Sequence, residues 1–189
     1  MRNFFLERNY VEVHTQNLRS ILAACEDPST IATYQYSGEV WPLPQTGQMH
    51  LENVLLDKPD YEGVFCLSTS YRNEPNPVPG RHDLIFPMFE FESKGTVKDL
   101  QAMQIDLLDH LGFDKTDGSY PEGDYLDICK KYDADELDNG HELQLEKDYG
   151  SVFFLKQFPF YTSPFWNMKS DFTTKQSNKI DVILHGIET

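Results

Sequence analysis

Charged and aromatic side chains gather in two stretches of extended sequence between residues 64 and 92, and their types suit the binding of a nucleotide. Arg72 and Glu74 lie in the first stretch, and Phe86 and Glu90 lie in the second. A guanidinium can bind a phosphate through two parallel hydrogen bonds, an aromatic ring can stack on a base, and carboxylates can accept hydrogen bonds from amine groups. Because side chains alternate between the two faces of a strand, one site forms only where the polar faces of both stretches coincide. An ordinary sheet with a polar solvent face is the alternative.

The two stretches are predicted to form a long hairpin with strands at Val64–Glu74 and Arg81–Glu92. The intervening residues 75–80 contain three prolines, which lack the N–H group that a strand ladder needs and therefore enforce a rigid loop. Arg81 and His82 follow directly after this loop, where their side chains could reach a terminal phosphate. The sequence has no Gly-x-Gly-x-x-Gly or Gly-x-x-x-x-Gly-Lys segment, so a phosphate would be held by side chains rather than by a glycine-rich loop.

The remaining segments predict helices beside an antiparallel sheet. Apolar residues recur every three or four positions between Thr96, a suitable N-cap, and Gly112, a suitable C-terminal stop, which predicts a helix. We also expect helices at Arg2–Asn9 and Gln48–Leu56, a strand that begins at Tyr10, and buried strands at Val152–Leu155 and Ile180–Leu184. This order indicates an α+β fold, an antiparallel β-sheet flanked by helices, in a single domain over residues 1–189.

The order and spacing of the hairpin residues resemble motif 2 of the class II aminoacyl-tRNA synthetases, in the aspartyl, asparaginyl and lysyl subgroup. The resemblance is carried by Tyr71-Arg72-Asn73-Glu74, a short loop, Arg81-His82, and Phe86-Pro87-Met88-Phe89-Glu90-Phe91-Glu92. Ile85 and Pro87 depart from the motif, because the subgroup usually has Glu and Thr at these positions. The resemblance implies a catalytic core that uses ATP, with Arg72 as the catalytic residue on the α-phosphate, Glu74 on the adenine amino group, Arg81 and His82 on the far phosphates, Phe86 stacked on the adenine, and Glu90 on the α-amino group of the amino acid.

Two further segments resemble the same family. Arg2–Leu18 resembles motif 1, through which these enzymes form homodimers, although Gln16 stands where a proline is usual. Near the other end, the segment from Asp181 to Glu188 resembles the strand and turn that supply magnesium ligands, with these two residues at the acidic positions. Mg²⁺ prefers hard oxygen donors and shares its shell with phosphates and water, so two carboxylates suffice. The resemblance therefore implies ATP and Mg²⁺ as cofactors, whereas the pattern alone is also compatible with a structural acidic pair.

The segment Gln45-Thr46-Gly47-Gln48-Met49-His50-Leu51-Glu52 is similar to the part of the asparaginyl enzymes that selects the amino acid. Aspartyl enzymes carry a lysine at the position of Leu51, and its absence removes the partner of a substrate carboxylate. Glu52 could accept a hydrogen bond from the amide of asparagine and would repel aspartate. The resemblance implies asparagine as the substrate, with Gln45, Gln48, Glu52 and Glu90 as the amino-acid-binding residues. An exposed helix residue is the alternative for Glu52.

The composition limits the partners and the location of the protein. The 16 Lys and Arg residues against 31 Asp and Glu residues give a formal net charge of −15, which argues against a broad nucleic-acid surface, so any contact with tRNA would be local. The acid is concentrated between residues 114 and 148, where a solvated face or a mobile loop is expected. No apolar run approaches the roughly 20 residues of a membrane span. The widely spaced Cys25, Cys66 and Cys129 predict neither a disulfide framework nor a zinc site and favour the cytoplasm.

The glycine-rich strand and the arginine of motif 3 are expected to be absent, because the sequence stops one residue after Glu188, and no anticodon-binding domain is expected. A fragment of a longer protein and a shortened relative are both compatible with this. The sequence leaves three functions open. The first is activation of asparagine for transfer to tRNA. The second is a stand-alone paralogue that passes the activated amino acid to another acceptor, and the third is a non-catalytic dimeric relative.

Overall fold

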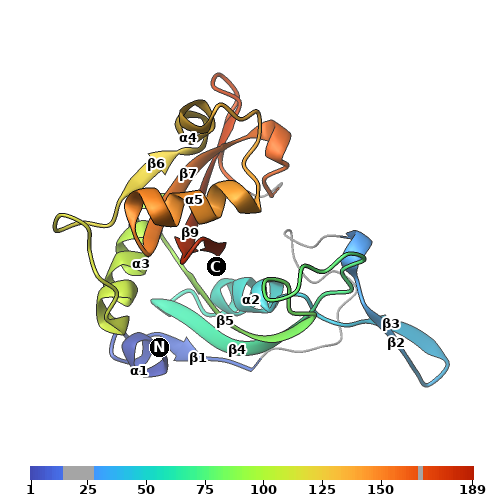
Figure 1. Cartoon of the computed structure of the whole chain (residues 1–189). Coiled ribbons are helices and arrows are strands. Elements are labelled where there is room, and N and C mark those ends of the chain that lie inside the picture. The colour runs from blue at the N-terminus through green and yellow to red at the C-terminus, as the bar shows by residue number, and fades with distance from the viewer. Residues whose placement is uncertain (15–27, 166–167) are drawn as a thin grey trace. The chain divides into compact units, whose positions relative to one another are not determined.

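The computed structural model describes residues 1–14, 28–165 and 168–189, and it divides into two compact units, Met1–Lys94 and Gly95–Thr189 (Figure 1). Each unit contains its own sheet with helices packed against it. The predicted α+β class is thereby confirmed. Within the described ranges, no helix is both long and apolar enough to cross a membrane. The expectations for Gln16 and Cys25 fall outside the described residues.

The sheet of the first unit has the strand order β1-β4-β5, where β1 is Val11–Glu12, β4 is Gly63–Tyr71 and β5 is Ile85–Ser93. Strands β4 and β5 form the predicted antiparallel hairpin, and β1 runs parallel to β4. Both long strands are shorter than predicted at the loop end, because the ladder stops at the pair Tyr71 and Ile85. Beyond that pair the Arg72 N–H still donates to the Leu84 carbonyl at 2.8 Å, but the next N–H, that of Asn73, donates to the Thr30 carbonyl at 2.8 Å and so leaves the hairpin.

The two faces of this sheet have different chemistry. On one face, Phe65, Phe89 and Phe91 pack around Phe5 of the short helix α1 (Arg2–Leu6), with ring centroids 4.9 to 5.5 Å from that of Phe5. On the other face, helix α2 (Gln48–Asp57) packs its buried Leu51 near one end of the strands. The rest of that second face carries polar residues, whose side chains can contact a ligand.

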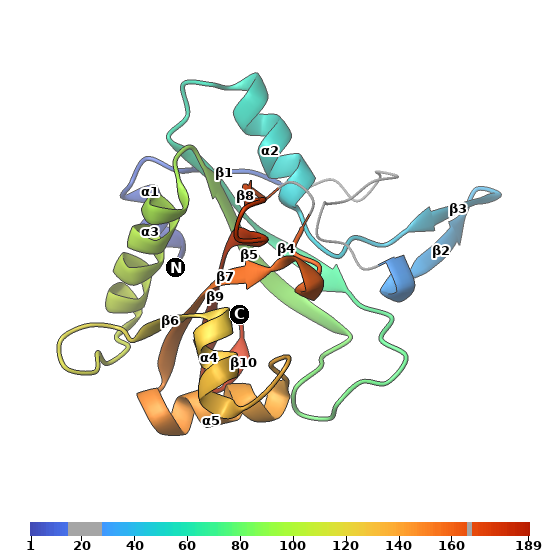
Figure 2. The ribbon, with the colours of Figure 1, turned by 90° about the horizontal axis from the view of Figure 1, so that it is seen from above.

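A second hairpin follows the 3-10 turn Pro28–Thr30 and consists of β2 (Thr33–Tyr36) and β3 (Glu39–Pro42). It extends away from the rest of its unit in both views (Figures 1 and 2). The sequence predicted only a loop-rich stretch here. Ser37 and Gly38 have φ values of 56° and 85°, which give the two-residue turn that favours tight hairpins.

The sheet of the second unit has the order β10-β9-β7-β6, with β8 paired to β9. These strands are β6 (Glu122–Asp124), β7 (Val152–Pro159), β8 (Ser170–Asp171), β9 (Gln176–Leu184) and β10 (Ile187–Glu188), and the short 3-10 helix η2 (Phe160–Thr162) follows β7. Helix α3 (Val97–Leu111) packs Leu108 against one face of the sheet. Helices α4 (Tyr125–Tyr132) and α5 (Asn139–Tyr149) cover the other face with a separate apolar cluster.

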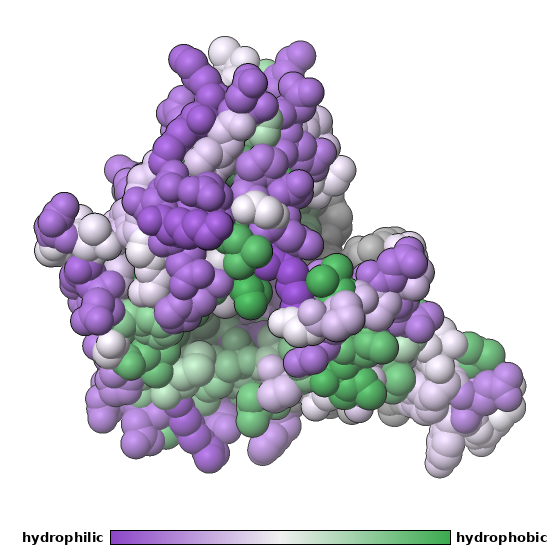
Figure 3. Space-filling model, in the orientation of Figure 1, coloured by the Kyte–Doolittle hydropathy of each residue, from purple (hydrophilic) through white to green (hydrophobic). Residues whose placement is uncertain are grey.

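The predicted ends of α3 are confirmed. Thr96 and Asp99 form a capping box, in which the side chain of each accepts a hydrogen bond from the backbone N–H of the other, and the helix ends at Gly112. The acidic stretch between residues 114 and 148 proves to be ordered, because it contains α4 and α5. Tyr125, Ile128 and Leu145 point into the core, and the surface over both helices is mainly hydrophilic in Figure 3. The solvated-face interpretation was therefore the better of the two.

The β7–β9 ladder contains a bulge at Gln157, because its register shifts between Lys156 and Phe158 and β9 has one residue more than β7 between the two flanking pairs. Gln157 has a φ of 58°, and this left-handed conformation breaks the alternation of β7 and turns the following side chain to the opposite face of the strand. Phe158 therefore lies opposite Ser177 and on the same face as Lys179 and Asp181. Without the bulge, alternation would place Phe158 on the α3 side of the sheet.

Candidate functional site

The polar faces of β4 and β5 coincide, as a joint site requires. Glu90 lies opposite Cys66, and Phe86 lies opposite Ser70, so these four side chains share one face of the sheet. The Arg72 Nε–H donates to the Ser70 Oγ at 3.2 Å, which holds the guanidinium on that same face. The structure therefore brings Arg72, Phe86 and Glu90 to one surface of the first unit.

The carboxylate of Glu90 is fixed by donors that carry no charge. The Gly47 N–H, just before the first turn of α2, donates to both carboxylate oxygens at 2.8 and 3.0 Å. The Ser68 hydroxyl donates at 2.5 Å, and the Thr46 hydroxyl donates to the other oxygen. Neutral donors and the N-terminal end of a helix stabilise a carboxylate without neutralising it. Glu90 is thus oriented and still carries a charge that a ligand cation could pair with.

Two neighbours of Glu90 titrate far from their ordinary ranges. Burial, followed by the charges of Glu52 and Glu90, raises the pKa of Glu92 to about 7. Burial and the Glu90 carboxylate raise the pKa of the Cys66 thiol to about 12, so this thiol stays protonated and unreactive. The effect of Glu52 on Glu92 indicates that α2 presents its carboxylate towards the same polar face.

The residues predicted to select the amino acid lie in and before α2. The Gln48 side-chain amide donates to Glu52 Oε1 at 3.0 Å, one helical turn away, and steadies that carboxylate. Gln45 is fully buried, and its side-chain amide donates to the Thr30 hydroxyl at 2.9 Å. The described geometry of Gln45 is that of a core hydrogen bond between two loops, so its proposed contact with substrate stays a prediction.

The other predicted nucleotide residues lie in the loop between β4 and β5. The backbone N–H groups of Arg81 and His82 both donate to the Val78 carbonyl, at 3.1 and 2.9 Å, in a tight turn. The His82 Nδ1 accepts a hydrogen bond from the Val78 N–H at 3.3 Å, and its ring is exposed. Glu74 is half-buried at the start of the same loop. These three residues are near the ends of the hairpin, as expected, and their roles stay predictions.

The predicted acidic pair lies in the second unit, and a lysine joins its two members. Strands β9 and β10 meet in a two-residue turn at His185 and Gly186, which places Glu188 on the same face as Asp181. A Cβ at Gly186 would lie 2.8 Å from the Leu143 Cα of α5, so this turn requires glycine for space as well as for its φ of 71°. The Lys179 Nζ lies 2.6 Å from Asp181 Oδ2 and 3.4 Å from Glu188 Oε1.

Charge and burial act against each other in this trio. Burial, followed by the charge of Glu188, raises the pKa of Asp181 to about 7, and the Lys179 ammonium opposes that rise. Burial also lowers the pKa of Lys179, but the two carboxylates outweigh it and raise that pKa. The Lys179 ammonium also lies 4.3 Å from the centre of the Phe158 ring, which the bulge at Gln157 brings to this face.

The donor chemistry of the acidic pair fits Mg²⁺, because both ligands are carboxylate oxygens and one cation already touches both. Among the described residues, no group of three or more His, Cys, Asp or Glu side chains is arranged to hold a metal ion. A dication at this place would therefore rely on Asp181, Glu188 and oxygens from outside the chain.

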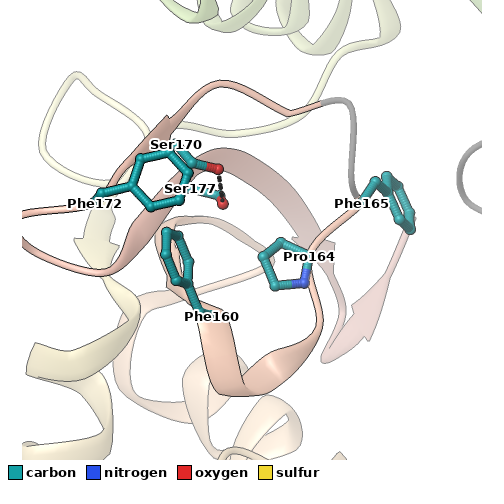
Figure 4. Close-up of a pocket in the computed structure, with 6 residues that line it drawn as sticks. All are labelled: Phe160, Pro164, Phe165, Ser170, Phe172 and Ser177. Atoms are coloured by element: carbon teal, nitrogen blue, oxygen red, sulfur yellow. Dashed lines mark hydrogen bonds between the residues drawn. The ribbon is translucent and has the colours of Figure 1, made fainter.

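An open pocket of about 190 Å³ lies elsewhere in the second unit. It is lined by Phe160, Pro164, Phe165, Ser170, Phe172 and Ser177. Figure 4 shows the rings of Phe160 and Phe172 close together, with centroids 5.5 Å apart, beside the hydrogen bond that joins the two serine hydroxyls. The pocket contains none of the predicted site residues.

Sequence reasoning missed the groups that hold the predicted residues in place. Thr46, Gly47 and Ser68 fix Glu90, and Lys179 occupies the space between Asp181 and Glu188. Cys66, Ser68 and Ser70 recur at every second position, and this was a usable signal, since small polar residues at period two mark one face of a strand. Nothing in the sequence around Lys179 indicates that its second partner, Glu188, is nine residues further along.

Comparison with known proteins places the chain in a family. The family model described as tRNA synthetases class II (D, K and N) matches residues 1–189, while a search of the curated proteins finds no match. Among solved structures, the chain is similar to asparaginyl-tRNA synthetase from Pyrococcus horikoshii complexed with asparaginyl-adenylate, with a TM-score of 0.80 and 22% identity over 99% of this chain and 49% of that one. Asparaginyl-tRNA synthetase from Entamoeba histolytica gives a TM-score of 0.75 and 18% identity over 97% and 46%.

Aspartyl-tRNA synthetase from Entamoeba histolytica gives a TM-score of 0.69 and 17% identity, with 99% of this chain and 41% of that chain covered. The chain thus spans about half the length of the solved structures it matches, and at these identities the likeness shows a shared fold. The family match covers the whole sequence, including the hairpin and the acidic pair described above. The chain belongs to the class II tRNA synthetases of the aspartyl, lysyl and asparaginyl group.

Proposed function

We propose that this chain is the part of a synthetase that activates asparagine with ATP to form asparaginyl-adenylate. The observation that carries the proposal is the polar face of the β4–β5 hairpin. Arg72, Phe86 and Glu90 share that face, and Glu90 is held there by neutral donors. A guanidinium, an aromatic ring and an uncompensated carboxylate are the groups that a phosphate, an adenine base and an α-ammonium group need.

In the proposed reaction, an oxygen of the asparagine carboxylate attacks the α-phosphorus of ATP, and pyrophosphate leaves as the bond from the α-phosphorus to its bridging oxygen breaks. Arg72 stabilises the charge that grows on the α-phosphate, and Glu90 holds the α-ammonium so that the carboxylate faces the phosphorus. Glu74, Arg81 and His82 bind the adenine and the far phosphates. Asp181 and Glu188 are the residues that would hold Mg²⁺, which would supply charge neutralisation of the phosphates.

The choice of asparagine depends on Glu52. Its carboxylate is steadied by Gln48 and faces the side of the sheet that carries Glu90 and Glu92. A fixed carboxylate can accept a hydrogen bond from an amide but meets the side chain of aspartate as a like charge. Gln45 and Gln48 complete the proposed amino-acid site. In the proposal, Thr46 and Ser68 act only through Glu90.

ATP–pyrophosphate exchange tests both the activity and the substrate. Asparagine should drive exchange at least about 100-fold better than aspartate or lysine, which corresponds to a few kcal/mol of discrimination. Glu52→Gln should reduce that preference and leave ATP binding nearly unchanged, whereas Asp57→Asn, which removes a charge at the far end of α2, should keep it. Equal or faster exchange with aspartate in the unmutated protein would refute asparagine as the substrate, and no exchange with any amino acid would refute the activity.

We propose a homodimer formed through α1 and the adjoining face of the β4–β5 hairpin. Leu67 and Ile85 lie on the same face as the aromatic cluster around Phe5 and are 67% and 65% exposed. Exposed apolar side chains that continue a buried cluster are typical of a surface covered by a partner. Sedimentation should show a dimer, and Leu67→Lys should dissociate it. Leu56→Lys, which changes an exposed side chain on α2, should leave the dimer intact. A monomer at high concentration would contradict the proposal.

An acceptor other than tRNA is the second candidate, and the formal charge of −15 favours it over broad RNA binding. A protein that catalyses exchange but does not charge tRNA would support this candidate. A protein that dimerises without exchange would support the non-catalytic relative. That residues 1–189 form one catalytic domain, in a cytoplasmic protein, stays part of the proposal.

A further inference from the structure

The Lys179 ammonium already occupies the position between the two carboxylates where a metal ion would bind. It lies 2.6 Å from an Asp181 oxygen and 3.4 Å from a Glu188 oxygen, so a single cation contacts both side chains. Lys179 and Asp181 are two residues apart on β9 and therefore point to the same face. The turn at residues 185–186 reverses the chain and brings Glu188 back to that face. The trio is therefore a built cation site whose cation is part of the chain.

The surroundings hold the ammonium in place. Its side chain is 17% exposed and that of Asp181 is 9% exposed, so water screens the pair poorly. The rings of Phe158 and Phe165 lie 4.3 and 5.9 Å from the ammonium and add attraction for a cation. A lysine on a flexible stem in bulk water would exchange freely, but this one is restricted by an ion pair on one side and aromatic rings on the other.

We propose that Lys179 is a resident cation of the Asp181 and Glu188 pair, and that a divalent metal ion binds there only in competition with it. A dication that approached the pair would meet a positive charge already in contact with both ligands. Binding would require the ammonium to move away, which leaves it half-buried without its carboxylate partners. The pair should therefore have a low affinity for metal in the unmutated protein. This inference depends on the proposed function only for naming the pair as the metal ligands.

Titration of the purified protein with Mn²⁺, with the free ion measured by electron paramagnetic resonance, tests the competition. Lys179→Met, which has a similar length and no charge, should bind one Mn²⁺ at least about tenfold more tightly than the unmutated protein. Lys179→Arg keeps the charge and should bind as weakly as the unmutated protein. The combination of Lys179→Met with Asp181→Asn should lose the gain, because the gain depends on the acidic pair.

Thermal unfolding gives a second measurement that does not depend on activity. Mn²⁺ should raise the melting temperature of Lys179→Met more than that of the unmutated protein, since a ligand that binds only the folded state stabilises it. Where Lys179→Met does not fold, Lys179→Gln, which can donate a hydrogen bond to Asp181 without a charge, should show the same direction. A folded uncharged variant that binds Mn²⁺ no more tightly than the unmutated protein would overturn the proposal. Because neither measurement uses ATP or an amino acid, failure of the exchange reaction would leave this result unaffected.

Discussion

Two carboxylates, Glu90 in the first unit and Asp181 in the second, are held on their sheets by different kinds of hydrogen-bond donor. Glu90 in the first unit is surrounded by a backbone N–H and hydroxyl groups, whereas Asp181 in the second unit is bound to an ammonium at 2.6 Å. Neutral donors orient a carboxylate and leave its negative charge available to a ligand, but a lysine ammonium at contact distance neutralises that charge. The difference indicates which acid is ready to receive a cationic group from a ligand and which must first release one of its own.

The largest effect should follow from neutralising Glu90, the acid whose charge is available to a ligand. Glu90→Gln removes the charge that is proposed to pair with the substrate α-ammonium, so kcat/KM for amino-acid-dependent exchange should fall about 100-fold, or roughly 3 kcal/mol. Urea unfolding of the same variant separates this loss from any change in stability. A variant with near-normal exchange would show that the α-ammonium is bound elsewhere and would remove the contrast between the two acids.

Removing the internal cation should damage the second unit in a different way. Lys179→Met leaves the Asp181 carboxylate in its buried position without a partner, which should lower the free energy of unfolding by about 2 to 3 kcal/mol at pH 8. The loss should be smaller at pH 5, because burial and Glu188 raise the pKa of Asp181 and the acid can then take up a proton. Equal losses at both pH values, measured by urea unfolding, would contradict the assigned role of the ammonium.

Glu92, the half-buried neighbour of Glu90, predicts a pH dependence of the opposite kind. The pKa of Glu92 is raised to about 7, so its folded form binds protons more tightly than the unfolded chain does. Its stabilising contribution is complete below the unfolded pKa and is lost as the pH rises through the folded pKa. Glu92→Gln should therefore be nearly neutral near pH 4 and should stabilise the protein by roughly 2 kcal/mol at pH 8.

The control for that measurement is Glu62→Gln, which removes one negative charge from an exposed position just before β4. Urea unfolding of both variants across the pH range gives the comparison. A gain for Glu92→Gln that is equally large at low pH would mean that packing, rather than ionisation, causes it.

The smallest effect should come from one of the neutral donors. Ser68→Ala removes a 2.5 Å hydrogen bond to Glu90 but keeps the Gly47 N–H and the Thr46 hydroxyl. Stability should fall by about 1 kcal/mol, and the KM for the amino acid should rise a few-fold. Thr69→Ala, one position along β4 and exposed on the opposite face, should leave both quantities unchanged. An identical rise in KM for both variants would show that the position of Ser68 on the polar face is irrelevant.

Local chemistry explains which elements could be predicted from the sequence. The prolines after Glu74 and the Thr96 and Asp99 capping box act on their own neighbours, so the hairpin loop and the start of α3 were readable. Helices α4 and α5 were missed because charged residues outnumber the few inward apolar ones, although Asp138 accepts hydrogen bonds from the first N–H groups of α5. The turn-forming Ser37 and Gly38 were a signal for the β2–β3 hairpin.

The candidate site divides in the same way. Alternation in β4 and β5 predicted that Arg72, Phe86 and Glu90 could share a face, and the register of the ladder places them there. The contacts of Glu90 with Gly47 and of Lys179 with Glu188 join separate segments of the chain. Such contacts depend on how helices and turns pack, which residue spacing does not encode.

The bulge at Gln157 also has a consequence for how this sequence can change over generations. A residue at position 157 that took up ordinary strand geometry would return β7 to strict alternation and would turn Phe158 to the α3 side, away from Lys179. A deletion of that residue would have the opposite result, because Phe158 would then follow Lys156 directly and alternation alone would keep its ring on the face of Lys179. Alignments of relatives that keep the aromatic ring should therefore show, at this position, either a residue that accepts a positive φ or a gap of one residue, so that the face of the ring is inherited even where the residues of β7 are not.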